Sequence, residues 1–112
     1  MIQKNNIDGI VLLDKPSMMS SNQAIQKIKK EFSLNKIGHT GTLDPLATGL
    51  LPLCIGKATK IARFLIDSDK TYHATIQLGE KTSTGDKEGE VIETSSVDLP
   101  GDSEVEQIIQ SF

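Results

Sequence analysis

The chain has 112 residues, of which 37% are hydrophobic and 24% are charged, as is usual for a globular protein of one domain. No apolar run approaches the roughly 20 residues of a membrane-spanning helix, and the amino terminus lacks the apolar core of a signal peptide, so we expect no membrane partner and a cytoplasmic location. The only cysteine, Cys54, excludes an internal disulfide, and with two histidines it provides too few ligands for a metal site.

The two halves of the chain differ in charge. Residues 1–65 hold nine basic and four acidic residues, a net charge of +5, whereas residues 66–112 have a net charge of −8. The basic half suits a phosphate backbone as its partner. Four lysines between residues 27 and 36 equally fit the solvated face of a helix, so both interpretations of this cluster stay open.

The first half of the chain predicts a strand, a helix and a second strand. Residues 7–13 form a short apolar run that indicates a buried strand. Apolar residues recur at helical spacing over residues 21–32, and the pair Ser20-Ser21 is placed to cap this helix. Residues 50–55 predict another buried strand, in which Pro52 indicates an edge position or a bulge.

The second half predicts two helices that flank a hairpin. Residues 57–66 show one apolar helical face. Residues 70–78 alternate like a strand, and residues 89–94 are the expected hairpin partner. Residues 103–112 begin an amphipathic helix, so helices and strands occur together along the chain.

The loop at residues 38–49 concentrates unusual backbone chemistry. Its three glycines allow angles that other residues resist, and Pro45 biases Asp44 toward an extended backbone. A carboxylate in such a loop is held in a set direction, which suits a functional site. An ordinary Asp-Pro turn explains the same spacing, and the residues alone do not decide between these interpretations.

Three motifs of this chain resemble those of the TruB family of tRNA pseudouridine-55 synthases. Residues 38–52 fill every fixed position of the catalytic motif GHTGxLDPxATGxLP. Residues 14–21 resemble the DKPxGxSS motif, although Met18 replaces its glycine and predicts a differently shaped turn. Residues 70–79 resemble the KxY…LG motif. Three ordered motifs are far more specific than a single glycine pattern.

The resemblance implies an α+β fold with a mixed, mainly antiparallel β-sheet and flanking helices, as an incomplete pseudouridine synthase fold. Residues 1–112 would form the amino-terminal part of the catalytic domain, with the rest of that domain and an RNA-binding PUA domain beyond it. The implied partner is the T-arm stem-loop of tRNA. The implied reaction moves the bond between ribose and uracil from N1 to C5, which requires no cofactor, no metal and no redox step.

The resemblance also implies a catalytic pair. Asp44 would be the nucleophile, because a carboxylate is ionised at neutral pH and can form a covalent intermediate. Tyr72 would stack on the flipped base and assist proton removal from C5, whereas without the resemblance it fits a core aromatic. The family's active-site arginine has no counterpart, since Arg63 is the only arginine and lies in the predicted second helix. We therefore expect the 112-residue chain to be inactive by itself.

Four further residues are implied at the substrate. His39 would fill or contact the space that base flipping opens, although its context also fits an ordinary loop histidine. Gly41 and Thr42 would line the site, and Lys15 would brace the catalytic loop or contact a phosphate. The alternative function is a non-catalytic RNA-binding module, which is disfavoured because one tyrosine and three phenylalanines offer little stacking surface.

Overall fold

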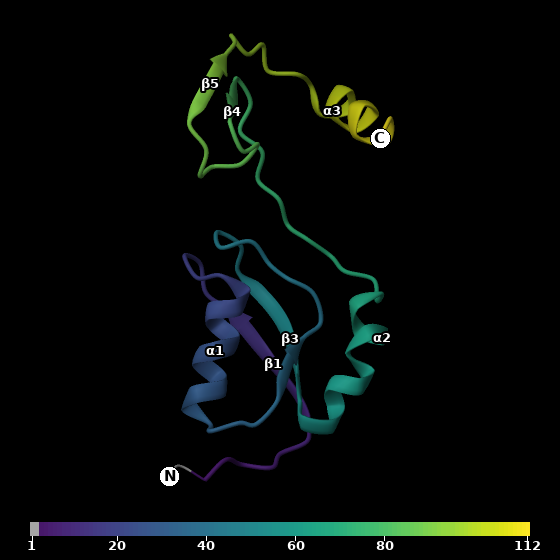
Figure 1. The fold of residues 1–112 in the computed structure, drawn as a ribbon. Coiled ribbons are helices and arrows are strands. Elements are labelled where there is room, and N and C mark those ends of the chain that lie inside the picture. Colours follow the sequence, from purple (N-terminus) through teal and green to yellow (C-terminus); the bar gives the residue numbers. More distant parts are fainter. Residues whose placement is uncertain (1–2) are drawn as a thin grey trace. The chain divides into compact units, whose positions relative to one another are not determined.

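The computed structural model of the chain describes residues 3–112 and consists of two compact units, the first ending at Lys70 and the second running from Thr71 to Phe112 (Figure 1). The elements of unit 1 are, in chain order, β1 Gly9–Lys15, α1 Ser21–Glu31, β2 Ile37–His39, β3 Gly49–Ile55, the 3₁₀-helix η1 Gly56–Ile61 and α2 Ala62–Ile66. Unit 2 contains β4 Glu80–Thr82, β5 Val91–Thr94 and α3 Asp102–Gln110.

The sheet of unit 1 is antiparallel, with β3 between β1 and β2. β1 pairs with the whole of β3, from Gly9 opposite Ile55 to Lys15 opposite Gly49. The shorter β2 pairs only with the last part of β3, and its final residue, His39, lies opposite Leu53. The expected α+β fold with antiparallel strands is confirmed, and the loop after His39 leaves the sheet beside the first half of β3.

Pro52 occupies the central strand, so the expectation of an edge strand or a bulge was wrong. It lies opposite Leu12 in a pairing that has no register shift. The Pro52 carbonyl accepts a hydrogen bond from Thr40 Oγ1 at 3.0 Å, on the side of β2. The N–H and C=O of one strand residue point to the same side of the strand. The N–H that Pro52 lacks would therefore also point to the side of β2, beyond the residue where β2 ends. Proline is tolerated there because no ladder bond is lost.

The core of unit 1 lies between α1 and one face of the sheet (Figure 1). Ile25 of α1 packs with Leu51 and Leu53 of β3, and four half-buried residues surround them: Leu13, Ile28, Ile37 and Leu43. The predicted helix over residues 21–32 is confirmed. Ser20 caps it in a reciprocal arrangement with Gln23, in which each backbone N–H donates to the other residue's side chain.

Three predictions for unit 1 and the connection that follows it need correction. The first strand is not buried, because β1 lies at the edge of the sheet and Leu12 is exposed. The second helix is divided into η1 and the short α2. Residues 71–78 form no strand, and among residues 3–112 no strand lies alongside them to supply ladder bonds.

Unit 2 is a hairpin followed by a helix. β5 pairs with β4, so the strand predicted over residues 89–94 is confirmed from Val91 onward, but with residues 80–82 as its partner. Between the strands, Asp86 accepts hydrogen bonds from the Thr84 hydroxyl at 2.6 Å and the Glu88 amide at 2.9 Å, which lower the pKa of its carboxyl. The predicted last helix is confirmed as α3. None of the helices formed by residues 3–112 has the length and apolar character that would let it cross a bilayer.

Candidate active site

The loop that joins β2 to β3 is anchored from the inside and exposed on the outside. Thr40 is buried, with its hydroxyl bonded to the Pro52 carbonyl. Leu43 packs its side chain against the core. His39, Thr42 and Asp44 are exposed. The loop therefore presents polar side chains to solvent from a backbone that the core holds in place.

Asp44 begins a tight turn. Its carbonyl accepts a hydrogen bond from the Ala47 amide at 2.9 Å, and Pro45 occupies the second position, where a fixed φ favours such turns. Within residues 3–112 the only ion pair joins Lys81 to Glu93, so no cation of the described chain pairs with the Asp44 carboxylate. The arginine, Arg63, instead places its guanidinium carbon 4.8 Å from the centre of the Phe64 ring.

The residue before Asp44 is held by a buried serine of α1. Ser21 Oγ donates to the Leu43 carbonyl at 2.9 Å and accepts from the Leu43 amide at 2.8 Å. Sequence reasoning considered Ser21 only as a helix cap and missed this contact. The signal was the serine pair itself, because one helix needs only one cap, and Ser20 supplies it.

The residue after Asp44 is held by the first motif. The Pro45 carbonyl accepts from the Met18 amide at 2.8 Å and from Lys15 Nζ at 3.3 Å. Lys15 is fully buried, and its ammonium also donates to the carbonyls of Pro16 at 2.8 Å and Met19 at 2.7 Å. Three carbonyls match the three donors of an ammonium group, so this geometry supports a bracing role and leaves no donor for a phosphate.

Met18 has a left-handed backbone, with φ of 62°. Glycine adopts this conformation without steric cost, whereas other residues resist it. Met18 thus adopts a backbone conformation that glycine favours. From this conformation its amide donates the hydrogen bond to the Pro45 carbonyl.

Two other predicted substrate residues lie at the start of the loop. His39 Nδ1 accepts a hydrogen bond from the Gly41 amide at 3.3 Å, which orients the imidazole. Gly41 has φ of 128°, a conformation that favours glycine. A Cβ at Gly41 would lie 4.0 Å from Cε of Lys70, whose ammonium donates to carbonyls at the end of α2, at 2.6 Å for Ile66 and 2.8 Å for Ser68.

Unit 1 therefore brings together the predicted residues from Lys15 to Asp44. Tyr72 belongs to unit 2, and the residue is 67% exposed. Among residues 3–112, no three histidine, cysteine, aspartate or glutamate side chains gather as metal ligands would. Cys54 is buried in β3, and burial raises the pKa of its thiol.

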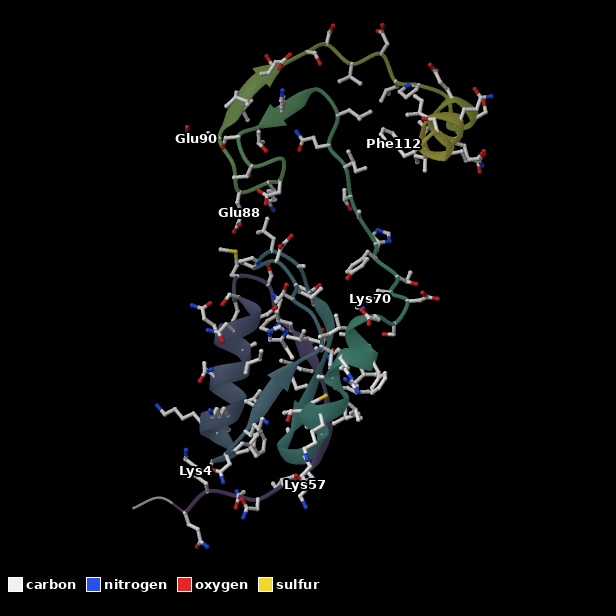
Figure 2. The ribbon with its side chains drawn as sticks, turned by 45° about the vertical axis from the view of Figure 1, so that its right-hand side comes forward. Lys4, Lys57, Lys70, Glu88, Glu90 and Phe112 are labelled. Atoms are coloured by element: carbon white, nitrogen blue, oxygen red, sulfur yellow. The ribbon has the colours of Figure 1, made fainter. Side chains whose placement is uncertain are left out.

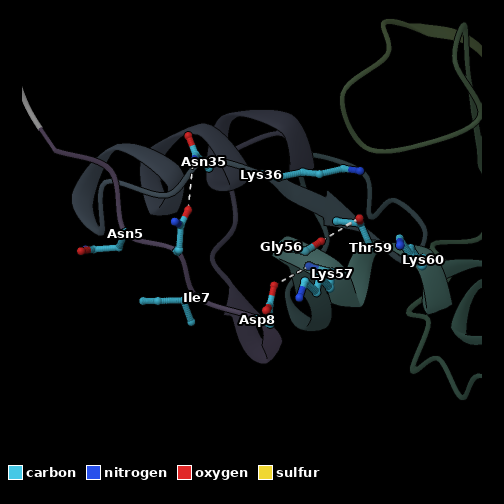
Figure 3. A pocket seen from close by; sticks show the side chains of 10 residues that line it. Asn5, Ile7, Asp8, Asn35, Lys36, Gly56, Lys57, Thr59 and Lys60 are labelled. Atoms are coloured by element: carbon cyan, nitrogen blue, oxygen red, sulfur yellow. Dashed lines mark hydrogen bonds between the residues drawn. The ribbon is translucent and has the colours of Figure 1, made fainter.

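A pocket of about 420 Å³ lies at the other end of β3 and contains none of the predicted site residues (Figure 3). Its lining includes Lys36, Lys57 and Lys60. Asp8 accepts a hydrogen bond from the Lys57 amide at 2.6 Å, which joins the start of β1 to η1. Figure 2 shows Lys57 at the end of unit 1 away from Lys70. Three lysines and one aspartate line this pocket, so unit 1 also carries positive charge at the end of β3 that is away from the Asp44 loop.

Comparisons with known proteins agree on one family. The family model described as "TruB family pseudouridylate synthase (N terminal domain)" matches residues 29–112. The "tRNA pseudouridine synthase B" of Marinomonas sp. (strain MWYL1) is 53% identical over 107 residues, which cover 96% of this chain and 35% of the relative. The protein of that name from Haemophilus influenzae (strain ATCC 51907) is 56% identical over 107 residues, or 96% of this chain and 33% of the relative.

A third relative, the "tRNA pseudouridine synthase B" of Neisseria meningitidis serogroup B, is 58% identical over 97 residues, which cover 87% of this chain and 32% of the relative. The chain thus spans about a third of the length of the curated relatives that it matches.

Proposed function

This chain belongs to the TruB family of pseudouridylate synthases, and on that premise we propose that it carries the nucleophile of a tRNA pseudouridine synthase. The observation that supports the proposal is the exposure of the Asp44 side chain on a fixed backbone. Its side chain is exposed, while the residues on both sides of it are held by hydrogen bonds from the first motif and α1. A reactive group needs this combination of access and fixed direction.

In the proposed reaction, the bond between ribose C1′ and uracil N1 breaks, the base turns, and C1′ bonds to C5. Asp44 bonds covalently to the nucleoside and is regenerated as a free carboxylate when the product forms, while C5 loses a proton to water and N1 gains one. Tyr72 stacks on the flipped base, and its hydroxyl assists the removal of this proton. Because the atoms of uridine are only rearranged, no second substrate is needed.

The proposed substrate is the T-arm stem-loop of tRNA. A uridine in this loop must leave its stack before a carboxylate can reach it, and the basic residues of unit 1 would meet the phosphates around it. His39, Gly41 and Thr42 lie at the start of the loop and would contact the flipped nucleotide. Lys15 would act by bracing the loop, because its ammonium is buried.

The experiment uses RNA that carries tritium at C5 of uridine. The full-length protein, meaning this chain together with any further residues of its natural protein, should release tritium to water from a T-arm stem-loop, because the new bond replaces the C5 hydrogen. It should release none from an anticodon stem-loop of equal length. Binding without tritium release from either RNA would instead support the alternative, a non-catalytic RNA-binding module.

We also propose that the 112-residue chain by itself releases no tritium. Within residues 3–112 the Asp44 carboxylate has no cationic partner to support and orient it, and Arg63 lies over Phe64. The purified chain should be compared with the full-length protein on the same RNA. Turnover by the chain would mean that these residues already form a complete site.

A further inference from the structure

We infer that Ser21 is a positioning residue for Asp44, an inference that rests on the proposed function. Its buried hydroxyl bonds to both backbone polar groups of Leu43, the residue that leads into Asp44. Ser21 touches neither the substrate nor the reacting atoms in this role. It sets the direction from which the carboxylate leaves the loop.

The geometry of the contact is reciprocal. Ser21 Oγ lies 2.9 Å from the Leu43 carbonyl oxygen and 2.8 Å from the Leu43 nitrogen. Ser21 as a whole is only 4% exposed. One hydroxyl can donate one hydrogen bond and accept others, so it satisfies both groups. The Leu43 carbonyl belongs to the planar peptide group that includes the nitrogen of Asp44, and fixing this plane fixes the start of Asp44.

The same helix face holds the Leu43 side chain. Ile25 lies one turn after Ser21 on α1 and therefore on the same face. Ile25 belongs to the core against which Leu43 packs. α1 thus holds Leu43 in two ways: Ser21 bonds to the backbone of Leu43, and the core that includes Ile25 packs against the Leu43 side chain.

A positioning role follows from what Asp44 lacks. Within residues 3–112 its exposed carboxylate forms no ion pair, so the described chain orients it through the backbone. A displacement of about 1 Å in a reacting group can lower a rate by roughly 10²-fold. Loss of the Ser21 hydroxyl frees the peptide group before Asp44 and should therefore affect the rate more than substrate binding.

Ser20 offers a matched control. It caps the same helix, with its hydroxyl accepting from the Gln23 amide at 3.1 Å, and no hydrogen bond joins its side chain to the loop among the described residues. Ser20→Ala should weaken α1 without freeing Leu43. Ser21→Cys keeps the size of the side chain but bonds weakly, and Ser21→Thr keeps the hydroxyl.

The test measures single-turnover tritium release by the full-length variants at saturating enzyme, well below their unfolding temperatures, together with the Kd for the RNA. Ser21→Ala and Ser21→Cys should be about 10- to 100-fold slower than wild type with Kd changed less than about twofold. Ser20→Ala and Ser21→Thr should stay within about threefold of the wild-type rate. Equal slowing of Ser20→Ala and Ser21→Ala, or a wild-type rate for Ser21→Ala, would overturn the inference.

Hydrogen exchange of the Leu43 amide supplies a readout that does not depend on activity. It should be faster in Ser21→Ala and unchanged in Ser20→Ala, and unchanged exchange in Ser21→Ala would also overturn the inference. If the wild-type protein releases no tritium, the proposed function fails, and Ser21 has no Asp44 reaction to serve. The exchange data would then still report whether Ser21 holds the loop.

Discussion

Lys15 Nζ lies 3.3 Å from the Pro45 carbonyl oxygen, and this contact joins the first motif of the chain to the turn that carries Asp44. The lysine is fully buried at the end of β1. A buried ammonium is tolerated only where its N–H groups form hydrogen bonds, and here three backbone carbonyls accept bonds from Lys15 Nζ. The two motifs are therefore one structural unit, in which the first supports the second.

Replacing this ammonium should destabilise the protein. Lys15→Met keeps an unbranched apolar stem but removes three hydrogen bonds, and within residues 3–112 only the Pro45 carbonyl keeps another donor, the Met18 amide. We expect a cost of about 1–3 kcal/mol in the free energy of unfolding. Urea denaturation measures the difference. Lys57→Met, at an exposed lysine, should change stability by less than about 0.5 kcal/mol. Equal stability of Lys15→Met and wild type would show that the buried bonds contribute nothing.

Asp44→Asn should abolish pseudouridine formation by the full-length protein while Kd for tRNA stays within about tenfold. The amide keeps the shape of the side chain but is not a nucleophile. Mass spectrometry of the tRNA after incubation detects the product, and filter binding gives Kd. Normal turnover by the variant would remove Asp44 from the nucleophile role.

Substitutions of Tyr72 should separate its two proposed roles. Tyr72→Phe keeps the stacking surface and loses the hydroxyl, whereas Tyr72→Leu loses both. If the hydroxyl assists proton removal, the single-turnover rate of Tyr72→Phe should fall by roughly 10²-fold, and that of Tyr72→Leu further. A wild-type rate for Tyr72→Phe would leave only the stacking role.

Gly56 should tolerate no side chain. Its φ is 61°, and an added Cβ would meet the Asp8 carboxylate and the Ile7 carbonyl. The backbone conformation alone costs about 1–3 kcal/mol for another residue, and the contact adds to it. Gly85→Ala is the control, because Gly85 has φ of 80° with open space around it. Thermal unfolding should show a larger loss for Gly56→Ala, and equal losses would contradict the contact.

Cys54 should react slowly with thiol reagents in the native protein. Only the thiolate is nucleophilic, and burial raises the pKa of this thiol above its ordinary value. Iodoacetamide at neutral pH, followed by peptide mapping, should modify Cys54 much faster in urea. The folded state holds the thiol proton more tightly, so this group's contribution to stability is complete below pH about 9 and declines above it. Rapid native labelling would contradict the burial.

The sequence by itself determined the elements that depend on neighbouring residues. The cap at Ser20, the helix that follows it and α3 are set by contacts three or four residues apart, which a pattern displays directly. The glycines and Pro45 drew attention to the loop around Asp44, but only the resemblance to one family favoured a functional site there over an ordinary turn.

Only the tertiary structure decided which segments pair and which polar groups are buried. The strand pattern of residues 70–78 has no partner among the described residues, and Pro52 fits a central strand because β2 ends before it. Ser21 meets Leu43 across 22 residues, and Lys15 meets Pro45 across 30. Such contacts depend on how distant segments fold together, so neither spacing nor propensity along the chain predicts them.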